Sequence, residues 1–465
     1  MKKVSNISVG SYCRAWLRVA IFTVAACGGT ASKDPGDAGI DSSIPDSGIA
    51  PSVEFQHVTL KKLVGDELIE QEYPALTVIR FLPDDHGLLL GSKEGAVYHY
   101  KLQADGSARY SGEFSLQDVH SSSECGLISM AIDPEWEANH YIYVGHCTSI
   151  QYSRVARITF DGTNYASVAA SAVEIINVGD DQATKAWHAV GAMGFFPDQY
   201  NSMWVLFGEK NLRDNAQDVS NNMGAALRII PERGASQGGY APHPENVFNA
   251  GQLDEDAGMP EDAGPGSDAS ITTESPDIYA YGFRSPWQGH LDSFGRLWIG
   301  DVGSTRFEEI NVVSVNGGEN FGWPVSEGPC ELGASGCAPF TEPEVHWDRS
   351  SNHPYRLDDG QSQPTSRRLA WVGLYYEPGD LDKYGGRLNR RLIFGDMCVG
   401  FVRALVLDSQ GLVTSNEHLG HFYGTSSWAQ GPDGYVYTTS FGSCSNGLPK
   451  NDDPGVGLFR MLPKQ

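Results

Sequence analysis

The chain has 465 residues, of which 40% are hydrophobic and 11% aromatic, so it can bury a large core and is not disordered as a whole. Its 58 acidic residues outnumber its 33 Lys and Arg, and the net charge of −25 argues against binding to the phosphate backbone of nucleic acids. No run of 18 apolar residues occurs, which excludes a multi-span membrane protein. The 54 Gly and 25 Pro, with many aromatic and β-branched residues, predict an all-β protein of short strands.

Residues 1–27 have the pattern of an export signal, in which basic residues precede a short apolar stretch at 19–26. The small residues before Cys27 resemble a bacterial lipobox, in which Cys27 is lipidated and becomes the first residue of the mature chain. A plain signal peptide cleaved after Ala26 is the alternative. Because Gly28 rather than Asp follows Cys27, we expect an outer-membrane lipoprotein that faces the periplasm or the cell surface, held to the membrane by lipid only.

Two stretches lack the apolar residues that a packed core needs. Residues 28–50 contain little but Gly, Ser, Asp, Pro and Ala, which predicts a disordered tether before a single domain at 51–465. Residues 249–270 are similar and acidic, and their Asp spacing does not fit an EF-hand because the closing Glu is missing. They are expected to form a disordered surface loop.

Removing the signal leaves six cysteines, an even number that suggests disulfides in an exported protein. Six cysteines allow fifteen connectivities. Neighbourhood along the chain favours three pairs, and a structural zinc site is disfavoured because no CxxC pair occurs. The favoured pairs are Cys125 with Cys147, Cys330 with Cys337, and Cys398 with Cys444.

One pattern recurs six times: a β-run, a tight Asp/Gly turn and a second β-run that ends in apolar residues. A single hairpin of this kind cannot bury both of its faces, whereas six arranged radially would form a β-propeller with four-stranded antiparallel sheets and long loops. A β-sandwich pair is the structural alternative. The repeats lie at 83–102, 133–159, 197–230, 292–313, 386–406 and 432–461.

The strongest motif block is 276–328, which contains AYGFRSPW, GDVG, EEIN and NFGWP in fixed order. Further motifs are ECGLISMAIDP at 124–134, HAVGAMGFFPD at 188–198 and FGDMCVG at 394–400. With these motifs the chain resembles the soluble quinoprotein glucose dehydrogenase and aldose sugar dehydrogenase group, the glucose/sorbosone dehydrogenase domain. FGDMCVG is closer to a branch that includes the Hedgehog-interacting protein. The resemblance covers about residues 55 to 463 and implies a six-bladed propeller.

The resemblance also implies a chemistry. Active members bind pyrroloquinoline quinone (PQQ) and calcium, and they transfer a hydride from the C1 of a sugar to the quinone while a His takes the hydroxyl proton. His188 matches that catalytic His. Glu209 lies where the family usually has an Asp, and its carboxylate could orient His188 and stabilise the protonated imidazole. A loop His and a solvated turn Glu are the alternatives for these two positions.

Three positions match cofactor contacts of the family. Arg284 matches an Arg that contacts the quinone cofactor, and a guanidinium suits a tricarboxylate. The alternative is that Arg284 pairs with Asp301 or Glu308 to hold its blade together. Ser285 follows it where the family has Asn, and Glu124 lies where active members carry Gln or Glu near the cofactor.

Four positions are candidate calcium ligands. The resemblance places Gly303 and Ser304 where backbone carbonyls ligate the ion. Glu308 and Glu309 could assist a nearby ion or simply cap a turn, and the sequence leaves both alternatives open.

The chain departs from the family pattern at Ser285, at Ala192, where an Arg is usual, and at Met397-Cys398, where the soluble glucose enzyme has a Lys. Two functions therefore remain open: a PQQ-dependent enzyme that oxidises aldoses, and a propeller without catalytic activity that binds a protein or glycan. A third, a lactonase-type hydrolase, would need a cluster of carboxylates at the central channel, and no clear set is visible in the sequence. The expected small-molecule partner is an aldose or another sugar-containing ligand.

Overall fold

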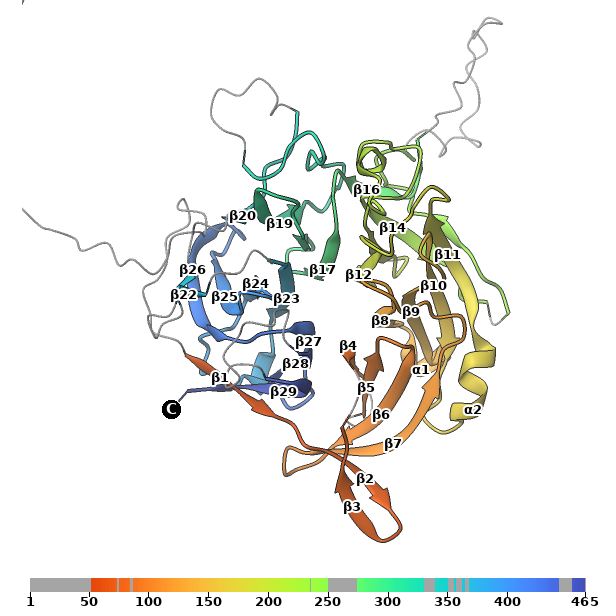
Figure 1. Cartoon of the computed structure of the whole chain (residues 1–465), viewed down its shortest axis with the longest axis vertical. Helices are drawn as coiled ribbons and strands as arrows, with labels where there is room; N and C mark the ends of the chain where they lie inside the picture. Colours follow the sequence, from red (N-terminus) through yellow and green to blue (C-terminus); the bar gives the residue numbers. More distant parts are fainter. Residues whose placement is uncertain are drawn as a thin grey trace, which may run out of the picture. The chain divides into compact units, whose positions relative to one another are not determined.

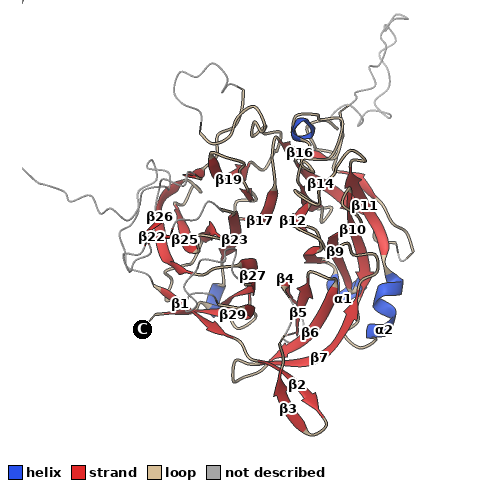
Figure 2. Ribbon diagram, in the orientation of Figure 1, coloured by secondary structure: helices blue, strands red, loops and turns tan. Residues whose placement is uncertain are grey.

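Six large sheets of mostly antiparallel strands and one two-stranded sheet make up the described part of the chain, with only short helical turns between strands (Figures 1 and 2). The computed structural model describes residues 52–72, 75–83, 87–234, 236–249, 274–329, 339–349, 355–356, 362–363, 368–442 and 454–464. These residues all lie within one compact unit, 36–465. Within these ranges, no helix has the length and apolar composition needed to cross a membrane.

Each sheet is one blade, and its strands follow one another along the chain. The first three blades are β4 (Leu76–Phe81), β5 (Gly87–Ser92), β6 (Ala96–Leu102) and β7 (Ala108–Ser115); β8 (Leu127–Ile132), β9 (Tyr141–Cys147), β10 (Tyr152–Thr159) and β11 (Val173–Gly179); β12 (Val190–Phe195), β13 (Met203–Phe207), β14 (Ala225–Pro231) and β15 (Tyr240–Pro242). The fourth and fifth blades are β17 (Pro286–Leu291), β18 (Leu297–Asp301), β19 (Phe307–Val313) and β20 (Val345–Asp348); β23 (Ala370–Tyr376), β24 (Arg391–Asp396), β25 (Phe401–Leu407) and β26 (Val413–His421).

The sixth blade combines both ends of the described chain. It contains β27 (Thr425–Gln430), β28 (Val436–Phe441) and β29 (Val456–Pro463), and β1 (Val53–His57) pairs antiparallel with β29 as its outer strand. The innermost strands contact one another in a closed ring, β4–β8–β12–β17–β23–β27 and back to β4 (Figure 1). The predicted six-bladed propeller is therefore confirmed, and the β-sandwich alternative is excluded.

Each of the six sequence repeats corresponds to the second and third strands of one blade. The repeat at 83–102 contains β5 and β6, for example, and the repeat at 292–313 contains β18 and β19. These middle strands are rich in apolar residues, and in four of the six blades a short connection joins them, so their pattern is visible in the sequence.

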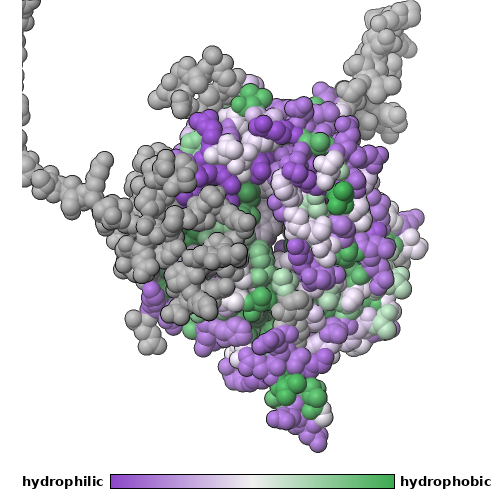
Figure 3. Space-filling view, in the orientation of Figure 1, coloured by the Kyte–Doolittle hydropathy of each residue, from purple (hydrophilic) through white to green (hydrophobic). Residues whose placement is uncertain are grey.

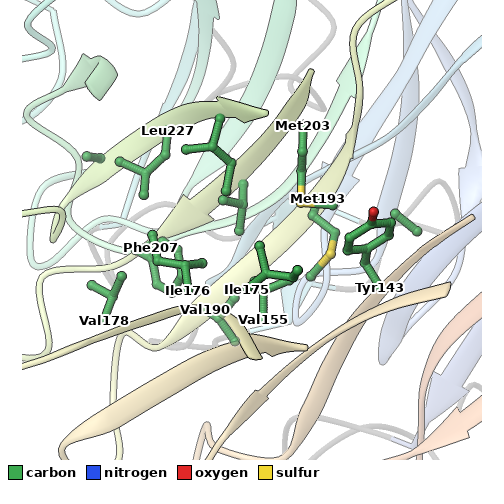
Figure 4. Packing of buried hydrophobic residues seen from close by; sticks show 14 of the residues in the cluster. Tyr143, Val155, Ile175, Ile176, Val178, Val190, Met193, Met203, Phe207 and Leu227 are labelled. Carbon is green, nitrogen blue, oxygen red and sulfur yellow. The ribbon is translucent and has the colours of Figure 1, made fainter. Parts of the chain in front are cut away.

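The faces of neighbouring blades pack against each other through apolar side chains. Figure 4 shows this packing between the second and third blades, where Val155 and Tyr143 meet Met193, Phe207 and other residues of the next blade. Interlocking of this kind buries both faces of each sheet, which a single blade cannot achieve.

The prediction of four-stranded sheets needs two corrections. β16 (Ile278–Tyr281) also pairs with β14, which gives the third blade five strands. The first blade has six, because β2 (Leu60–Val64) runs parallel to β7 and forms a hairpin with β3 (Glu67–Glu70). This hairpin projects from the propeller and exposes apolar side chains such as Leu63 and Leu68 (Figure 3).

The remaining elements are short. A separate two-stranded sheet joins β21 (Tyr355–Arg356) and β22 (Ser362–Gln363). The helical turns are α1 (Trp136–Asn139), α2 (Tyr165–Val168), η1 (Ala169–Ser171), η2 (Arg213–Ala216) and η3 (Gly379–Leu381).

The predicted disulfide between Cys125 and Cys147 is present. Cys398 is also disulfide-bonded, whereas Cys444, its predicted partner, lies outside the described residues, as do Cys330 and Cys337. The predicted signal, Cys27 and the tether at 28–50 also lie outside them, as does the acidic stretch except for Asn249.

The pairing of β1 with β29 predicts that the first strand stabilises the whole ring. Val53 is buried in the core of the last two blades. Val53→Ala should lower the free energy of unfolding by about 2 kcal/mol, because two methyl groups are lost and a cavity remains. Chemical denaturation measures this change. Glu54→Ala, an exposed substitution on the same strand, is the control and should shift stability by less than about 0.5 kcal/mol. Equal effects of the two variants would contradict a closing role for β1.

Candidate active site

A cavity of about 380 Å³ lies at one end of the central channel. The innermost strands of all six blades contribute to its wall at or next to their first residues, so residues far apart in sequence meet there. Representative wall residues, one from each blade in order, are Thr77, Ile128, Val190, Pro286, Leu369 and Ser426.

The cavity brings together four of the predicted site residues, which are His188, Glu124, Arg284 and Ser285. They come from loops that precede three innermost strands: Glu124 before β8, His188 before β12, and Arg284 with Ser285 before β17. The enzyme hypothesis required His188 and Arg284 to share one pocket, and they do.

His188 and Glu209 form a buried pair at the cavity wall. Nδ1 of His188 lies 2.9 Å from Oε1 of Glu209, and the two side chains are only 3% and 1% exposed. A carboxylate can only accept hydrogen bonds. Nδ1 of His188 therefore carries the proton and donates a hydrogen bond to Glu209. This contact fixes the ring and leaves Nε2 as the nitrogen that can accept a proton.

The backbone of His188 adopts a conformation that needs support. Its φ is +47°, in the left-handed region that side chains other than glycine rarely adopt. Two contacts hold it there: the His188 N–H donates to Oε2 of Glu124 at 2.8 Å, and Lys210 N donates to the His188 carbonyl at 3.3 Å. Gly208 packs so closely that an added Cβ would lie 2.5 Å from that carbonyl oxygen. Such strained residues concentrate at functional sites.

Arg284 is held by backbone carbonyls. Its Nη1 donates to the carbonyls of Val302 and Gly303 at 2.7 and 2.8 Å. The carboxylate of Asp301 accepts instead from the backbone N–H groups of Arg284 and Ser285, at 2.9 and 2.7 Å. Burial raises the pKa of Asp301 to about 6, although these hydrogen bonds oppose the shift. Asp301 thus shapes the turn that presents Arg284, and its contacts to Arg284 are with the backbone.

Lys93 and its neighbours were not found from the sequence. Lys93 lines the cavity and its Nζ donates to the carbonyl of Ser123 at 2.5 Å. Ser123 in turn accepts from the indole N–H of Trp187 at 2.9 Å. Trp287 and Phe441 add aromatic surface to the wall. A second cation in the wall of the same cavity as Arg284 favours anionic ligands despite the net charge of −25 of the whole chain.

Three of the four predicted calcium ligands contact other groups through the predicted oxygens, and Ser304 contacts a neighbour through its N–H group. The Gly303 carbonyl accepts from Arg284, and Ser304 N donates to Oε1 of Glu327 at 2.6 Å. Glu308 forms an ion pair with Arg349 and accepts from Ala370 N at 2.7 Å. Among the described residues, no group of three or more His, Cys, Asp and Glu could hold a metal ion.

A calcium ion at the Gly303 carbonyl would share one oxygen with a guanidinium, and the two cations would repel each other. The residues present therefore do not fit calcium in the predicted position. The contacts of Glu308 link its own blade to the first residue of β23 in the next blade.

The departures from the family pattern at Ala192 and at Met397-Cys398 also have defined surroundings. Ala192 is buried in the core between two blades, Met397 lines the cavity, and Cys398 is held in a disulfide. Met397 thus contributes apolar surface at the cavity wall, and Lys93 lines the cavity from the first blade.

Comparison with known proteins agrees with these motifs. A sequence model of the family described as glucose/sorbosone dehydrogenase matches residues 74–245 and 249–443, which is most of the chain. Aldose sugar dehydrogenase YliI of Escherichia coli (strain K12) is 22% identical over 273 residues, 57% of this chain and 62% of that protein. The HIPL2 protein of Arabidopsis thaliana is 37% identical over 71 residues, 15% of this chain and 10% of that protein. The chain thus spans less than two thirds of the length of these curated relatives.

Solved structures share the fold. The PQQ-bound aldose sugar dehydrogenase of Streptomyces coelicolor superposes with a TM-score of 0.59 at 17% identity, covering 89% of this chain and 98% of that one. The apo form of the soluble aldose sugar dehydrogenase of Escherichia coli gives a TM-score of 0.55 at 17% identity, covering 89% and 100%. At these identities the likeness establishes the propeller alone.

Glu309 generates a prediction about stability. It is buried beside Asp301, accepts from Gly328 N at 2.5 Å, and lies 3.2 Å from the Asn311 amide nitrogen. Burial, with a smaller contribution from the Asp301 carboxylate, raises the pKa of Glu309 from 4.5 to about 8. The folded chain therefore keeps this proton between pH 4.5 and 8 while the unfolded chain loses it, so stability falls as pH rises through that window.

Glu309→Gln cannot ionise and should remove this part of the pH dependence, so that its advantage over the wild type grows from pH 5 to pH 8. Its amide keeps an acceptor for Gly328 and can donate to Asn311 Oδ1, a buried atom with no hydrogen-bond partner among the described residues. Denaturant unfolding at the two pH values measures the difference. Glu137→Gln, at an exposed position, is the control. Parallel curves for Glu309→Gln and the wild type would contradict a protonated Glu309.

Proposed function

The chain belongs to the glucose/sorbosone dehydrogenase family, and we propose that it is a PQQ-dependent oxidoreductase that removes a hydride and a proton from the C1–OH group of an aldose. The single observation that carries this proposal is the convergence of the buried His188–Glu209 pair with Arg284 on one cavity. PQQ, when bound, supplies the hydride acceptor that no amino-acid side chain can provide.

His188 is the proposed proton acceptor. With Nδ1 donating to Glu209, Nε2 is available to take the proton of the C1 hydroxyl as the hydride leaves C1. Glu209 then faces an imidazolium and stabilises its charge, and it keeps the ring in one orientation throughout. The imidazole must return this proton to solvent before the next turnover.

The cofactor would be bound by the cationic side chains and the apolar wall of the cavity. Arg284 keeps further guanidinium N–H groups beyond the nitrogen held by Val302 and Gly303, and these can fork onto a carboxylate. Lys93 adds a second positive charge, while Trp287, Met397 and Phe441 offer flat or adaptable apolar surface for a planar ring system. Since calcium does not fit the predicted carbonyls, no step here depends on it.

We also propose that the chain is exported and anchored through a lipidated Cys27. The lipobox-like sequence supports this proposal, as does the Cys125–Cys147 disulfide, because such bonds persist in oxidising compartments.

The decisive experiment pairs calorimetric titration of PQQ with dye reduction by a panel of aldoses. His188→Gln should bind PQQ as the wild type does and lose about 10²- to 10⁴-fold in the rate of dye reduction, because only the proton acceptor is removed. His57→Gln, at an exposed position on β1, is the matched control and should keep the rate. Failure of the wild-type protein to bind PQQ at high micromolar concentration would overturn the proposal and favour a non-catalytic module that binds a sugar or protein.

A second experiment tests the role of Lys93. Lys93→Met should weaken PQQ binding by about 10- to 100-fold, the range expected for loss of one charge-assisted hydrogen bond. Lys185→Met is the control, because Lys185 lies over the Trp187 ring rather than in the cavity wall. Titrations run with a chelator and with added calcium should give the same affinity. An affinity that depends strongly on calcium would contradict the assignment of the neutralising charge to Arg284 and Lys93.

A further inference from the structure

Behind His188, three loops and two strands are joined by a chain of contacts that the proposed reaction does not itself use. The loop before β8 carries Glu124 and Cys125, and the disulfide links Cys125 to Cys147 at the end of β9. Ser153 on β10 and Lys210 in the loop after β13 continue the chain. Figure 1 shows β8, β9 and β10 in one blade, with β12 of the next blade beside them.

The contacts form a closed circuit that begins and ends at His188. Cys147 Sγ lies 3.6 Å from Ser153 Oγ, and Lys210 Nζ donates to the same oxygen at 2.7 Å. Lys210 N donates to the His188 carbonyl at 3.3 Å. On the other side, the Glu124 carboxylate accepts from the His188 N–H at 2.8 Å and is one residue from the disulfide.

Apolar packing joins the disulfide to the loop of His188 as well. Both half-cystines are fully buried and pack with Ala186 and Ala189, which lie on either side of His188 in sequence. Glu124 N donates to the Ala186 carbonyl at 3.1 Å, so the loop of the disulfide is bonded to the loop of His188 at two points. A movement of Cys125 would therefore move the segment that carries the imidazole.

The conformation of His188 explains why such support is needed. A left-handed φ is unfavourable for a non-glycine residue, so the isolated loop would not keep it. Ser123 and Lys210 are also left-handed, with φ of +51° and +59°. Lys210 contacts His188 directly, and Ser123 accepts from Trp187, the residue before His188. Strained residues grouped in this way hold their shape only if the surrounding bonds over-determine it.

Lys210 is an unusual choice for a purely structural position. Its side chain is 1% exposed, and burying an ammonium group is unfavourable unless its hydrogen bonds are made. An apolar side chain of similar length would fill the same space without that penalty. The ammonium group instead donates to Ser153, which ties the loop of Glu209 to the blade that carries the disulfide.

From this geometry we infer that Lys210, Ser153 and the Cys125–Cys147 disulfide are positioning residues that hold His188 and its Glu209 contact in the orientation needed for proton transfer. This inference rests on the proposed function for its consequence in catalysis, while the orientation of the ring is a property of the protein itself. None of the four residues lines the cavity, so they act through His188 and not on the substrate.

The test uses three variants of the full chain: Lys210→Met, Ser153→Ala, and the double variant Cys125→Ala/Cys147→Ala. Each should lower the rate of dye reduction at saturating aldose at least tenfold, while PQQ affinity and KM stay within about threefold of the wild type. A misplaced general base affects the reacting step more than binding, which produces this split.

A spectroscopic signature is independent of activity. The His188 Nδ1 proton shared with Glu209 should give a low-field proton resonance in protein labelled with ¹⁵N-histidine, assigned by its loss in His188→Gln. The three variants should broaden or shift this resonance. Should the wild type fail to bind PQQ, the proposed function fails, but the resonance still tests the positioning of His188.

Val155→Ala is the matched control, because Val155 is buried on β10 two residues from Ser153 and is not part of the circuit. It should lose stability yet keep both the rate and the resonance. Lys210→Met and Ser153→Ala proteins that fold and keep the wild-type resonance would overturn the inference. So would a Val155→Ala protein that loses rate and resonance as the other variants do, because the effect would then follow stability alone.

Discussion

The ring of six innermost strands is the constraint on which the rest of the structure depends. Each blade has two apolar faces, and it can bury both only if a neighbour packs on either side. Closure therefore requires the sixth blade to take β1 from the start of the domain and pair it with β29. The same closure places the beginnings of six strands around one point. Ser426, for example, donates to the carbonyl of Leu76 across 350 positions of sequence. The cavity is thus a consequence of the architecture, and its chemistry is set by the loops that lead into those strands.

Charges inside this protein are stabilised by specific partners rather than by solvent. Glu209 is paired with His188, Asp301 with two backbone N–H groups, and Arg284 with two carbonyls. Because buried charges without such bonds are strongly unfavourable, each of these groups also fixes the backbone around it. The polar groups that could perform chemistry are therefore the same groups that determine the conformation of the loops.

The sequence predicted the parts of the fold whose patterns are local. All six hairpins were visible, because their strand-forming composition and their turn residues do not depend on distant residues. The innermost strands were not located, since strands such as β8 and β23 are buried along nearly their whole length and lack an alternating pattern. The pairing of β2 with β7 in parallel was also not predicted, because nothing in either segment specifies the direction of its partner.

In the candidate site, too, residues within local motifs were found from the sequence, whereas residues whose role depends on distant partners were not. The motifs singled out His188, Glu124, Arg284 and Ser285, and all four line one cavity. Lys93 was missed, because a Lys in a turn between two strands is ordinarily a solvated surface residue and only the ring brings it to the site. Glu308 could not be assigned either, since its partner Arg349 lies in a segment far along the chain.

The way Arg284 is held bears on how an acidic protein can bind an anion. A mobile guanidinium would lose rotamer freedom on binding and would be attracted to the many surface carboxylates of a chain with a net charge of −25. The carbonyls of Val302 and Gly303 instead orient it during folding, so that little reorganisation remains when a ligand arrives. Carbonyls also leave the positive charge of Arg284 largely uncancelled, whereas a carboxylate partner would neutralise it. Because Asp301 contacts only the backbone N–H groups beside Arg284, it shapes the turn without forming an ion pair with the guanidinium. The arrangement therefore keeps a directed positive charge at the wall of the cavity.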